Sequence, residues 1–536
     1  MSLSLLQTYH GRIIDINPNL DPLRSKYSAY RVLIIALLMF ASFTVVLLVD
    51  AQWGIGVSPD SVEYLALARN VIEFNGYVGS DGKAMPSWPP LYPVSLGVFS
   101  SLFHLDVLAV VPYCHAFLLS MIILVLFRIS RIYGWSIQKE IAAGCMVLLS
   151  VPLLYVATWV WSELFFSLLV ALFIYYSSLY VKTDLKKYIV AMAIIAGLAT
   201  LTRYIGVTLI FTGVIYLLVF KKIEAKTRIS RVLLFAIFSS LPLLLFIVRN
   251  YYETSTLTGD RSEPVTMLFP QIFEVFSVLS RWFLPFNGSI RLVLLVFLLG
   301  MLFTVFKLRE LKSLIKENQI IISLIFIVIY IVSTILLSTI TVIDSIGHRL
   351  LAPLYIPILI VAVAFFSGLI GIQNQRGRKN VLLGVKLLLS LTLIGAFTQR
   401  MIFEVIPEFS SGYNYMSARW KESSTIEFMK SHKLSESRII YSNHPDALHF
   451  HSRLRSVKFT PAKSVHHPVS LEELEGTWPQ TDNATLIWFD PTPRNFLYNL
   501  DELKKVSELE KIRTFQDGAV YTVRKRLISK EVDQGR

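Results

Sequence analysis

The sequence predicts an α-helical polytopic membrane protein with about 11 or more transmembrane helices, followed by a C-terminal soluble α/β domain. Hydrophobic residues make up 54% of the 536 residues and charged residues only 16%, whereas soluble domains carry roughly 25% charged residues. About eleven apolar stretches approach the length of about 20 residues that spans a bilayer. After residue 401 the polarity becomes ordinary, and strand and helix patterns alternate.

The candidate spans follow one another within residues 32–401, which we expect to form one transmembrane domain. Residues 1–31 are polar and lack a small-residue cleavage site, so we predict an uncleaved cytoplasmic segment. The short apolar piece Leu91–Phe103 follows two prolines, and we predict a re-entrant or interfacial helix there. The predicted spans are Val32–Val49, Leu108–Phe127, Ile141–Ala157, Leu164–Val181, Tyr188–Leu201, Val207–Phe220, Val232–Val248, Ile290–Phe306, Ile320–Ile340, Leu350–Leu369 and Val381–Thr398.

The basic residues predict the orientation of these spans. The formal net charge is +14, and most of the excess lies in short loops between spans, which is typical of cytoplasmic loops and does not indicate nucleic acid binding. With a cytoplasmic N-terminus, every strongly basic short loop falls inside. We therefore expect a plasma (inner) membrane protein whose residues 50–107, 250–289 and 402–536 lie on the periplasmic or extracytoplasmic side.

The stretch Ser58–Phe74, SPDSVEYLALARNVIEF, predicts an amphipathic helix within the exoplasmic loop 50–107. Ser58 is a suitable N-cap, and Asp60 in the first turn is favoured by the helix dipole. Asp60 and Tyr64 share one side, and Glu63 lies one helical step away. The two carboxylates are candidates for a general base or a metal ligand. A solvated interfacial helix with acidic first-turn residues is the alternative.

The remaining candidate site residues lie at predicted outer ends of the spans. Burial of a charge in lipid costs about 2.5–3.5 kcal/mol, so charges gathered there indicate a site at the outer membrane interface. The basic side chains could bind a lipid phosphate through charge-assisted hydrogen bonds, with Asp344 as a salt-bridge partner of Arg349. Stray surface arginines and a dipole-compensating acid are the alternatives. These residues are Glu163, Arg203, Arg249, His348 and Arg349.

Residues 402–536 predict a small α/β domain on the outer face. We expect helices around Trp420–Lys430 and Arg494–Lys505, and a hairpin within Lys511–Val523 that turns at Asp517-Gly518. The histidine pairs His449-x-His451 and His466-His467 have no HExxH motif or cysteine pair beside them, so solvated histidines are favoured over zinc ligands. The expected strands are Arg438–Ser442, Ser456–Thr460 and Ala484–Phe489.

Six motifs in a fixed order resemble the membrane-embedded C-type glycosyltransferases, specifically the family 39 group with lipid A aminoarabinose transferases and protein O-mannosyltransferases. The resemblance implies that Asp60 is catalytic and that Arg203 and Arg349 hold the donor phosphate. Ser61 replaces the second acid of the family's usual Asp-Glu pair, so no cofactor is certain and a divalent metal stays open. The motifs are PDSVEYLALARNV (59–71), WPPLYP (88–93), WSELFF (161–166), GLATLTRYIG (197–206), RNYY (249–252) and HRLLAPLYIP (348–357).

We therefore predict an integral membrane glycosyltransferase, a hexosyl- or pentosyltransferase, that uses a polyprenyl-phosphate-linked sugar donor. Nucleotide sugars are not available outside the plasma membrane, so an outer-face enzyme needs a lipid-linked donor. The acceptor is a glycan, a lipid or a protein. Asp60 is the expected general base, with Glu63 beside it, and Tyr64, Glu163, Arg249 and His348 join the two arginines in substrate binding. A transporter or flippase of lipid-linked sugars and a surface-polysaccharide polymerase or ligase are the alternatives.

Overall fold

A computed structural model gives the fold. It describes residues 22–219, 224–259, 261, 267–283, 320–342, 344–364, 395, 397–399, 411–431, 439–454, 457–464, 468–490 and 494–526. The predicted span Ile290–Phe306, nearly all of Val381–Thr398, His466-His467 and the predicted domain boundary at residue 401 lie outside this part of the chain.

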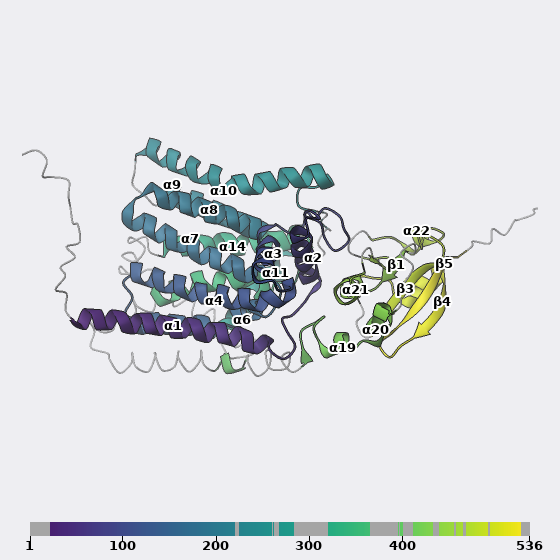
Figure 1. The fold of residues 1–536 in the computed structure, drawn as a ribbon. Helices are drawn as coiled ribbons and strands as arrows, with labels where there is room; N and C mark the ends of the chain where they lie inside the picture. Colours follow the sequence, from purple (N-terminus) through teal and green to yellow (C-terminus); the bar gives the residue numbers. More distant parts are fainter. Residues whose placement is uncertain are drawn as a thin grey trace, which may run out of the picture.

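Long helices lie side by side with their axes roughly aligned and form a bundle (Figure 1). Two short helices, α2 and α3, lie at one end of this bundle, next to the described residues after 411, which we call the tail domain. The described helices of the bundle are α1 (Pro22–Asp50), α2 (Pro59–Ile72), α3 (Leu91–Phe103), α4 (Val107–Ile132), α5 (Ile137–Leu148), α6 (Val151–Ala157), α7 (Glu163–Thr183), α8 (Lys186–Thr202), η1 (Tyr204–Gly206), α9 (Val207–Val219), α10 (Ala225–Thr254), α11 (Leu268–Phe283), α14 (Ile321–Ile340), α15 (His348–Leu351) and η2 (Ala352–Leu354).

Five of the described helices are long and apolar enough to cross a membrane: residues 29–50 of α1, and α4, α7, α10 and α14. The bent pair α5 and α6 would make a sixth span, and the helices over 91–103, 204–219 and 348–364 are apolar but shorter. A polytopic membrane fold is therefore confirmed. The total of about eleven spans stays a prediction.

The predicted single span Ile141–Ala157 is wrong in its geometry, because the chain bends by 46° between α5 and α6. Ser150 lies at the break, and its hydroxyl accepts a hydrogen bond from the N–H of Leu153 at 3.3 Å. Pro152 occupies the first turn of α6, where its missing N–H leaves no helical hydrogen bond unmade. The cap and the proline start a new helix within one apolar stretch.

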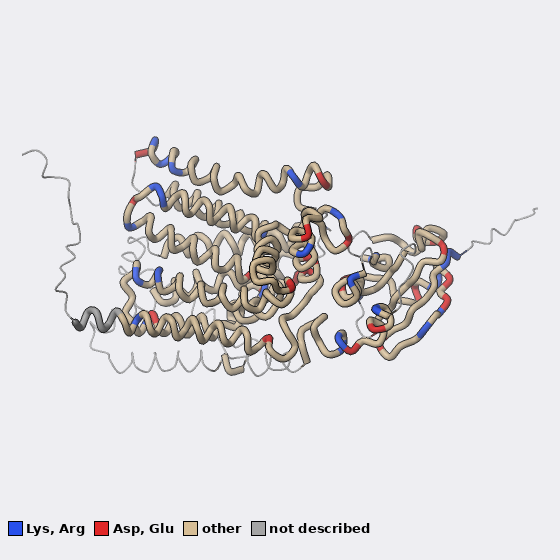
Figure 2. The backbone as a smooth tube through the Cα atoms, in the orientation of Figure 1, with Lys and Arg blue, Asp and Glu red and all other residues tan. Residues whose placement is uncertain are grey.

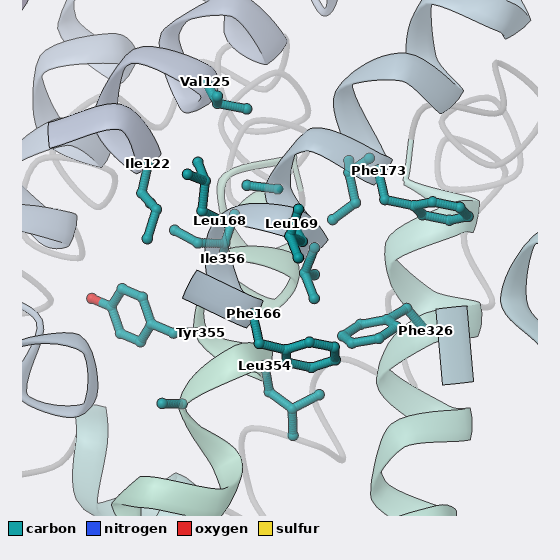
Figure 3. Close-up of a cluster of buried hydrophobic side chains, with 14 of the residues drawn as sticks. Ile122, Val125, Phe166, Leu168, Leu169, Phe173, Phe326, Leu354, Tyr355 and Ile356 are labelled. Carbon is teal, nitrogen blue, oxygen red and sulfur yellow. The ribbon is translucent and has the colours of Figure 1, made fainter. Parts of the chain in front are cut away.

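The core of the bundle lies between α4, α7, α14 and the segment after α15, as Figure 3 shows. Phe166 and Phe173 of α7 are fully buried and lie near Phe326 of α14. Ile122 of α4 and Leu354 of η2 belong to the same cluster of buried side chains. These large side chains fix the position of α7, whose first residue is Glu163.

Lys and Arg gather at the end of the bundle away from the tail domain (Figure 2), where α4 and α7 end and where α8 and α10 begin. The pattern agrees with the predicted cytoplasmic side. An ion pair lies there as well, because Arg231 contacts Asp184 at 2.6 Å.

The tail domain contains a mixed five-stranded sheet with the order β2-β1-β3-β5-β4. β1 is parallel to β2 and β3, and β5 is antiparallel to β3 and β4. All three predicted strands and the predicted hairpin are present, and α21 and α22 are additional. The elements are α19 (Ala418–Lys421), α20 (Ser424–Ser431), β1 (Ile440–Ser442), α21 (Pro445–Ser452), β2 (Val457–Phe459), α22 (Leu471–Leu474), β3 (Ala484–Phe489), α23 (Leu500–Val506), β4 (Ser507–Thr514) and β5 (Gly518–Lys525).

The tail domain packs directly on α2. A single cluster of buried apolar side chains contains Val62 and Leu65 of α2 together with Leu448 of α21 and Phe489 of β3. At the rim, the N–H of Tyr415 donates to the carbonyl of Val57 at 3.2 Å. The bundle and the tail domain therefore share one hydrophobic core around α2.

Candidate functional site

Helix α2 presents Asp60 beside the start of α7 because Ser58 fixes the first turn of α2. The Ser58 hydroxyl accepts a hydrogen bond from the N–H of Ser61 at 3.4 Å and caps the helix. The same oxygen accepts from the indole N–H of Trp161 at 2.8 Å. The cap thus ties α2 to the segment that leads into α7.

The guanidinium of Arg349 lies at the centre of a cluster of three carboxylates. Its Nη2 lies 2.6 Å from Oδ2 of Asp60, and its Nε lies 2.6 Å from Oε1 of Glu163. Its Nη1 donates to the carboxylate of Asp344. The side chains of Asp344 and Asp60 are 61% and 32% exposed, whereas that of Glu163 is 1% exposed. The cluster thus has one buried carboxylate and two that reach solvent.

Glu163 joins Arg203 to the same cluster. Its Oε1 lies 2.6 Å from Nη1 of Arg203 and so contacts both arginines. Arg203 also donates to the hydroxyl of Ser162 at 3.0 Å, and that hydroxyl lies 3.1 Å from the hydroxyl of Tyr64. Asp60, Glu163, Arg203 and Arg349, which are far apart in the sequence, are therefore brought together, and Tyr64 reaches them through Ser162.

Aromatic rings cover one side of the cluster. The guanidinium carbon of Arg349 lies 4.2 Å from the centroid of Trp161, a cation–π contact, and Trp159 stacks on Trp161 at 4.6 Å. His348, next to Arg349, accepts a hydrogen bond from Trp282 of α11 at 2.8 Å. His348 thus links α11 to this corner.

Glu63 points to a different part of the molecule. The N–H of Ser80 donates to its Oε2 at 3.0 Å, and the Ser80 hydroxyl donates to its Oε1. Burial raises the pKa of Glu63 to about 7, against the lowering effect of the two hydrogen bonds from Ser80. Asp60 and Glu63 therefore have different partners, and Glu63 holds the loop around Ser80.

Arg249 contacts the loop that follows α2, as Glu63 does, and is not among the described partners of Arg349. Its Nη2 donates to the carbonyl of Tyr77 at 3.1 Å, and its guanidinium carbon lies 5.5 Å from the Tyr77 ring. The neighbouring Asn250 donates to the carbonyl of Pro86 at 3.5 Å. Arg249 and Asn250 thus join the end of α10 to the loop that follows α2.

No family model matches the chain, and no curated protein matches its sequence. Among solved structures, the apo structure of ArnT from Cupriavidus metallidurans aligns with 92% of this chain and 98% of its own, at 14% identity and a TM-score of 0.58. The chain therefore has the fold of ArnT. ArnT bound to undecaprenyl phosphate aligns over the same shares with a TM-score of 0.57.

An oligosaccharyltransferase of Archaeoglobus fulgidus, solved in complex with Zn and sulfate, shares this fold. It aligns with 91% of this chain and 73% of its own, at 9% identity and a TM-score of 0.52. The TM-scores show a common fold, and identities this low carry no information on the substrates of this chain.

The carboxylates of the cluster around Arg349 do not fit a divalent metal site. Asp60, Glu163 and Asp344 all point to one guanidinium, so a cation already lies between them. In the part of the chain that the structure describes, no three His, Cys, Asp or Glu side chains are placed to hold a metal ion.

Trp161 and Ser162 of this site were not predicted from the sequence. Ser58 was predicted as the N-cap, but its hydrogen bond with Trp161 was not. The first two belong to the WSELFF motif, in which Glu163 alone was singled out. Their neutral side chains carry no charge signal. The motif itself was the signal that could have found them.

Proposed function

We propose that the chain is an integral membrane glycosyltransferase that moves a sugar from a polyprenyl-phosphate donor to an acceptor at the outer face of the plasma membrane. The observation that carries the proposal is the contact of Arg349 with both Asp60 and Glu163, at 2.6 Å each, beside Arg203. This contact supports Asp60 as a base that acts beside two fixed cations. The fold of ArnT, solved with undecaprenyl phosphate, supports a lipid phosphate as the donor's carrier.

In the proposed reaction, a hydroxyl oxygen of the acceptor attacks the anomeric carbon of the donor sugar. The bond from that carbon to the phosphate oxygen breaks, and the lipid phosphate leaves with the electron pair. Its growing negative charge is stabilised by Arg203 and Arg349. The hydroxyl proton passes to the carboxylate of Asp60. Direct displacement inverts the anomeric centre.

Each ion pair has a distinct task in this proposal. Glu163 is buried and contacts both guanidiniums, so it orients them before the donor binds. Asp344 is the most exposed partner of Arg349, so a donor phosphate can take its place at the lowest cost in desolvation. Asp60 keeps its contact with Arg349 and lies beside the leaving group.

Asp60→Asn tests the proposal in cells, because the amide keeps the shape of the side chain and cannot accept a proton. We expect the sugar to disappear from the surface glycan or lipid and the lipid-linked donor to accumulate, since loss of a general base lowers rates roughly 10²- to 10⁴-fold. The measurement is mass spectrometry of both pools.

Asp501→Asn is the matched control, because Asp501 is 87% exposed on the tail domain, where it pairs with Lys504. Asp60→Asn protein that is present in the membrane at the wild-type level, with unchanged glycans and donor, would remove Asp60 from the reaction.

A further inference from the structure

A pocket lined by charged, polar and small side chains lies on the opposite side of α2 from Asp60. Its volume is about 540 Å³, and it lies between the second half of α2, the loop 78–82 and the end of α21 in the tail domain. Figure 1 shows α2 and α21 facing each other at the junction of the two domains. Known small-molecule sites have volumes of about 300–1,000 Å³, so a small ligand fits.

The pocket is separate from the transfer site. Arg69, which lines it, comes nine residues after Asp60 in the same helix. Nine residues are two and a half helical turns, so Arg69 faces away from Asp60 and lies about 14 Å further along the axis. A group bound here is therefore not the group that reacts beside Asp60.

The walls alternate positive and negative groups. Arg69 of α2 and Arg453 at the end of α21 supply two guanidiniums, while Glu73 and Asp106 supply two carboxylates. Asp106 joins the two domains, because Nη2 of Arg69 lies 3.0 Å from its Oδ1 and Nη2 of Arg453 lies 4.0 Å from its Oδ2. The formal charges of these four side chains cancel.

Neutral polar groups share the rest of the lining with Ala66, Val78 and two glycines. The amide of Asn70 donates to the carbonyl of Val78 at 2.9 Å and so holds the loop 78–82 as a wall. The amide of Asn75 donates to Oε2 of Glu73 at 3.1 Å. His449 lies on the tail-domain side. The lining thus offers hydrogen-bond donors and acceptors on every wall.

We infer that this pocket binds a sugar unit of a glycan acceptor, away from the hydroxyl that reacts. Ring hydroxyls both donate and accept hydrogen bonds, which suits carboxylates, guanidiniums and amides set side by side. A free anion would be favoured by a net positive site, whereas the four charged side chains here cancel. The inference rests on the proposed transferase function. It specifies an acceptor longer than one sugar.

Photo-crosslinking in cells tests the inference with the full chain. The photoreactive residue p-benzoylphenylalanine replaces Asn75, which is exposed and lines the pocket. The control position is Tyr252, an aromatic residue at the end of α10 that is 84% exposed and does not line the pocket. We expect a heavier, glycan-stained adduct from position 75 and none from position 252.

The outcomes separate this inference from the proposed function. Glycans that change in Asp60→Asn cells, with no glycan adduct at position 75, overturn the pocket and leave the transferase standing. A glycan adduct at position 75 with unchanged glycans in Asp60→Asn cells supports the pocket and removes Asp60 from the reaction. Adducts that contain only lipid or protein, or equal glycan adducts at both positions, overturn the sugar site.

Discussion

Glu163 is the residue on which the two arginines of the site depend. It is buried, and its Oε1 lies 2.6 Å from both Arg203 and Arg349. Arg349 has two further acidic partners, Asp60 and Asp344, whereas the acidic partner of Arg203 in the described residues is Glu163 alone. Loss of the Glu163 charge therefore affects Arg203 most.

Glu163→Gln should destabilise the protein, because removing one partner of a buried pair costs about 3–5 kcal/mol. The double variant Glu163→Gln/Arg203→Gln removes both charges and should recover part of that loss. The measurement is the Tm of the detergent-solubilised protein. A single variant as stable as wild type would show that the pair does not hold the site together.

The folded double variant also tests the role of Arg203 toward the donor. We expect it to bind undecaprenyl phosphate more weakly than wild type, since one of two proposed phosphate-binding cations is gone. Binding of wild-type strength would exclude Arg203 from phosphate recognition.

Glu63 should make the stability of the protein depend on pH. Burial raises its pKa from 4.5 to about 7 in the folded chain, so the folded state holds the proton more tightly than the unfolded state. The stabilisation is fully present below about 4.5 and is lost as the pH rises through about 7. The Tm of the wild type should therefore fall between pH 5 and pH 8 more than that of Glu63→Gln.

The exposed Glu73, which directly follows helix α2, supplies the control for the change from Glu to Gln. Equal profiles for wild type and Glu63→Gln would mean that Glu63 carries the same protonation in the folded and unfolded chains.

The sequence predicted the place of the site better than its contacts. Glu163, Arg203 and Arg349 were predicted at outer ends of the spans and Asp60 on a helix of the outer loop 50–107, and the structure brings the four together. The direction of Glu63 could not be predicted, because its partner Ser80 lies in a loop without periodicity. Helical spacing defines a side of a helix and does not define which neighbour covers it.

At the scale of elements, α2 is held in place by close packing against α3. Gly97 of α3 faces α2, and a Cβ at that position would lie 2.9 Å from the carbonyl oxygen of Ala68 and 2.9 Å from Cγ2 of Ile72. The two helices can approach this closely only with a glycine at the contact.

Gly97→Leu should push α2 away from α3 and lower both activity and stability. Overpacking costs about 1–3 kcal/mol, and a shift of α2 moves Asp60 relative to Arg349. Val98→Leu is the matched control, because Val98 is 57% exposed on the same helix. The measurements are the Tm and the sugar content of the surface glycan. Normal glycans with Gly97→Leu would show that the contact does not position α2.

The sequence predicted α3 and β3 to the residue, because a run of apolar residues between clear stop signals defines both. It missed the break between α5 and α6, because a hydropathy pattern averages over the Ser150 cap and Pro152. It also missed α21, a helix of 8 residues whose place is set by packing on α2 and not by its own period.

At the scale of the whole molecule, the proposed orientation makes a direct prediction. With Cys114 and Cys145 replaced by serine, single cysteines at Asp501 and Tyr252 should react with a membrane-impermeant maleimide in intact cells. A cysteine at Lys186 or Lys226, at the opposite end of the bundle, should react only after the membrane is opened. The reverse pattern would place Asp60 and both arginines on the cytoplasmic side and end the proposal of an outer-face donor site.

The shared core around α2 limits how this protein can be recombined with others of the same fold. Side chains of α2, α21 and β3 pack in one cluster, so a foreign tail joined near residue 411 would meet an α2 surface shaped for a different partner. A working chimera would therefore have to carry α2 and the tail domain together from one parent. The same restriction applies to natural divergence, so we expect the sequences of α2 and of the tail domain to change together.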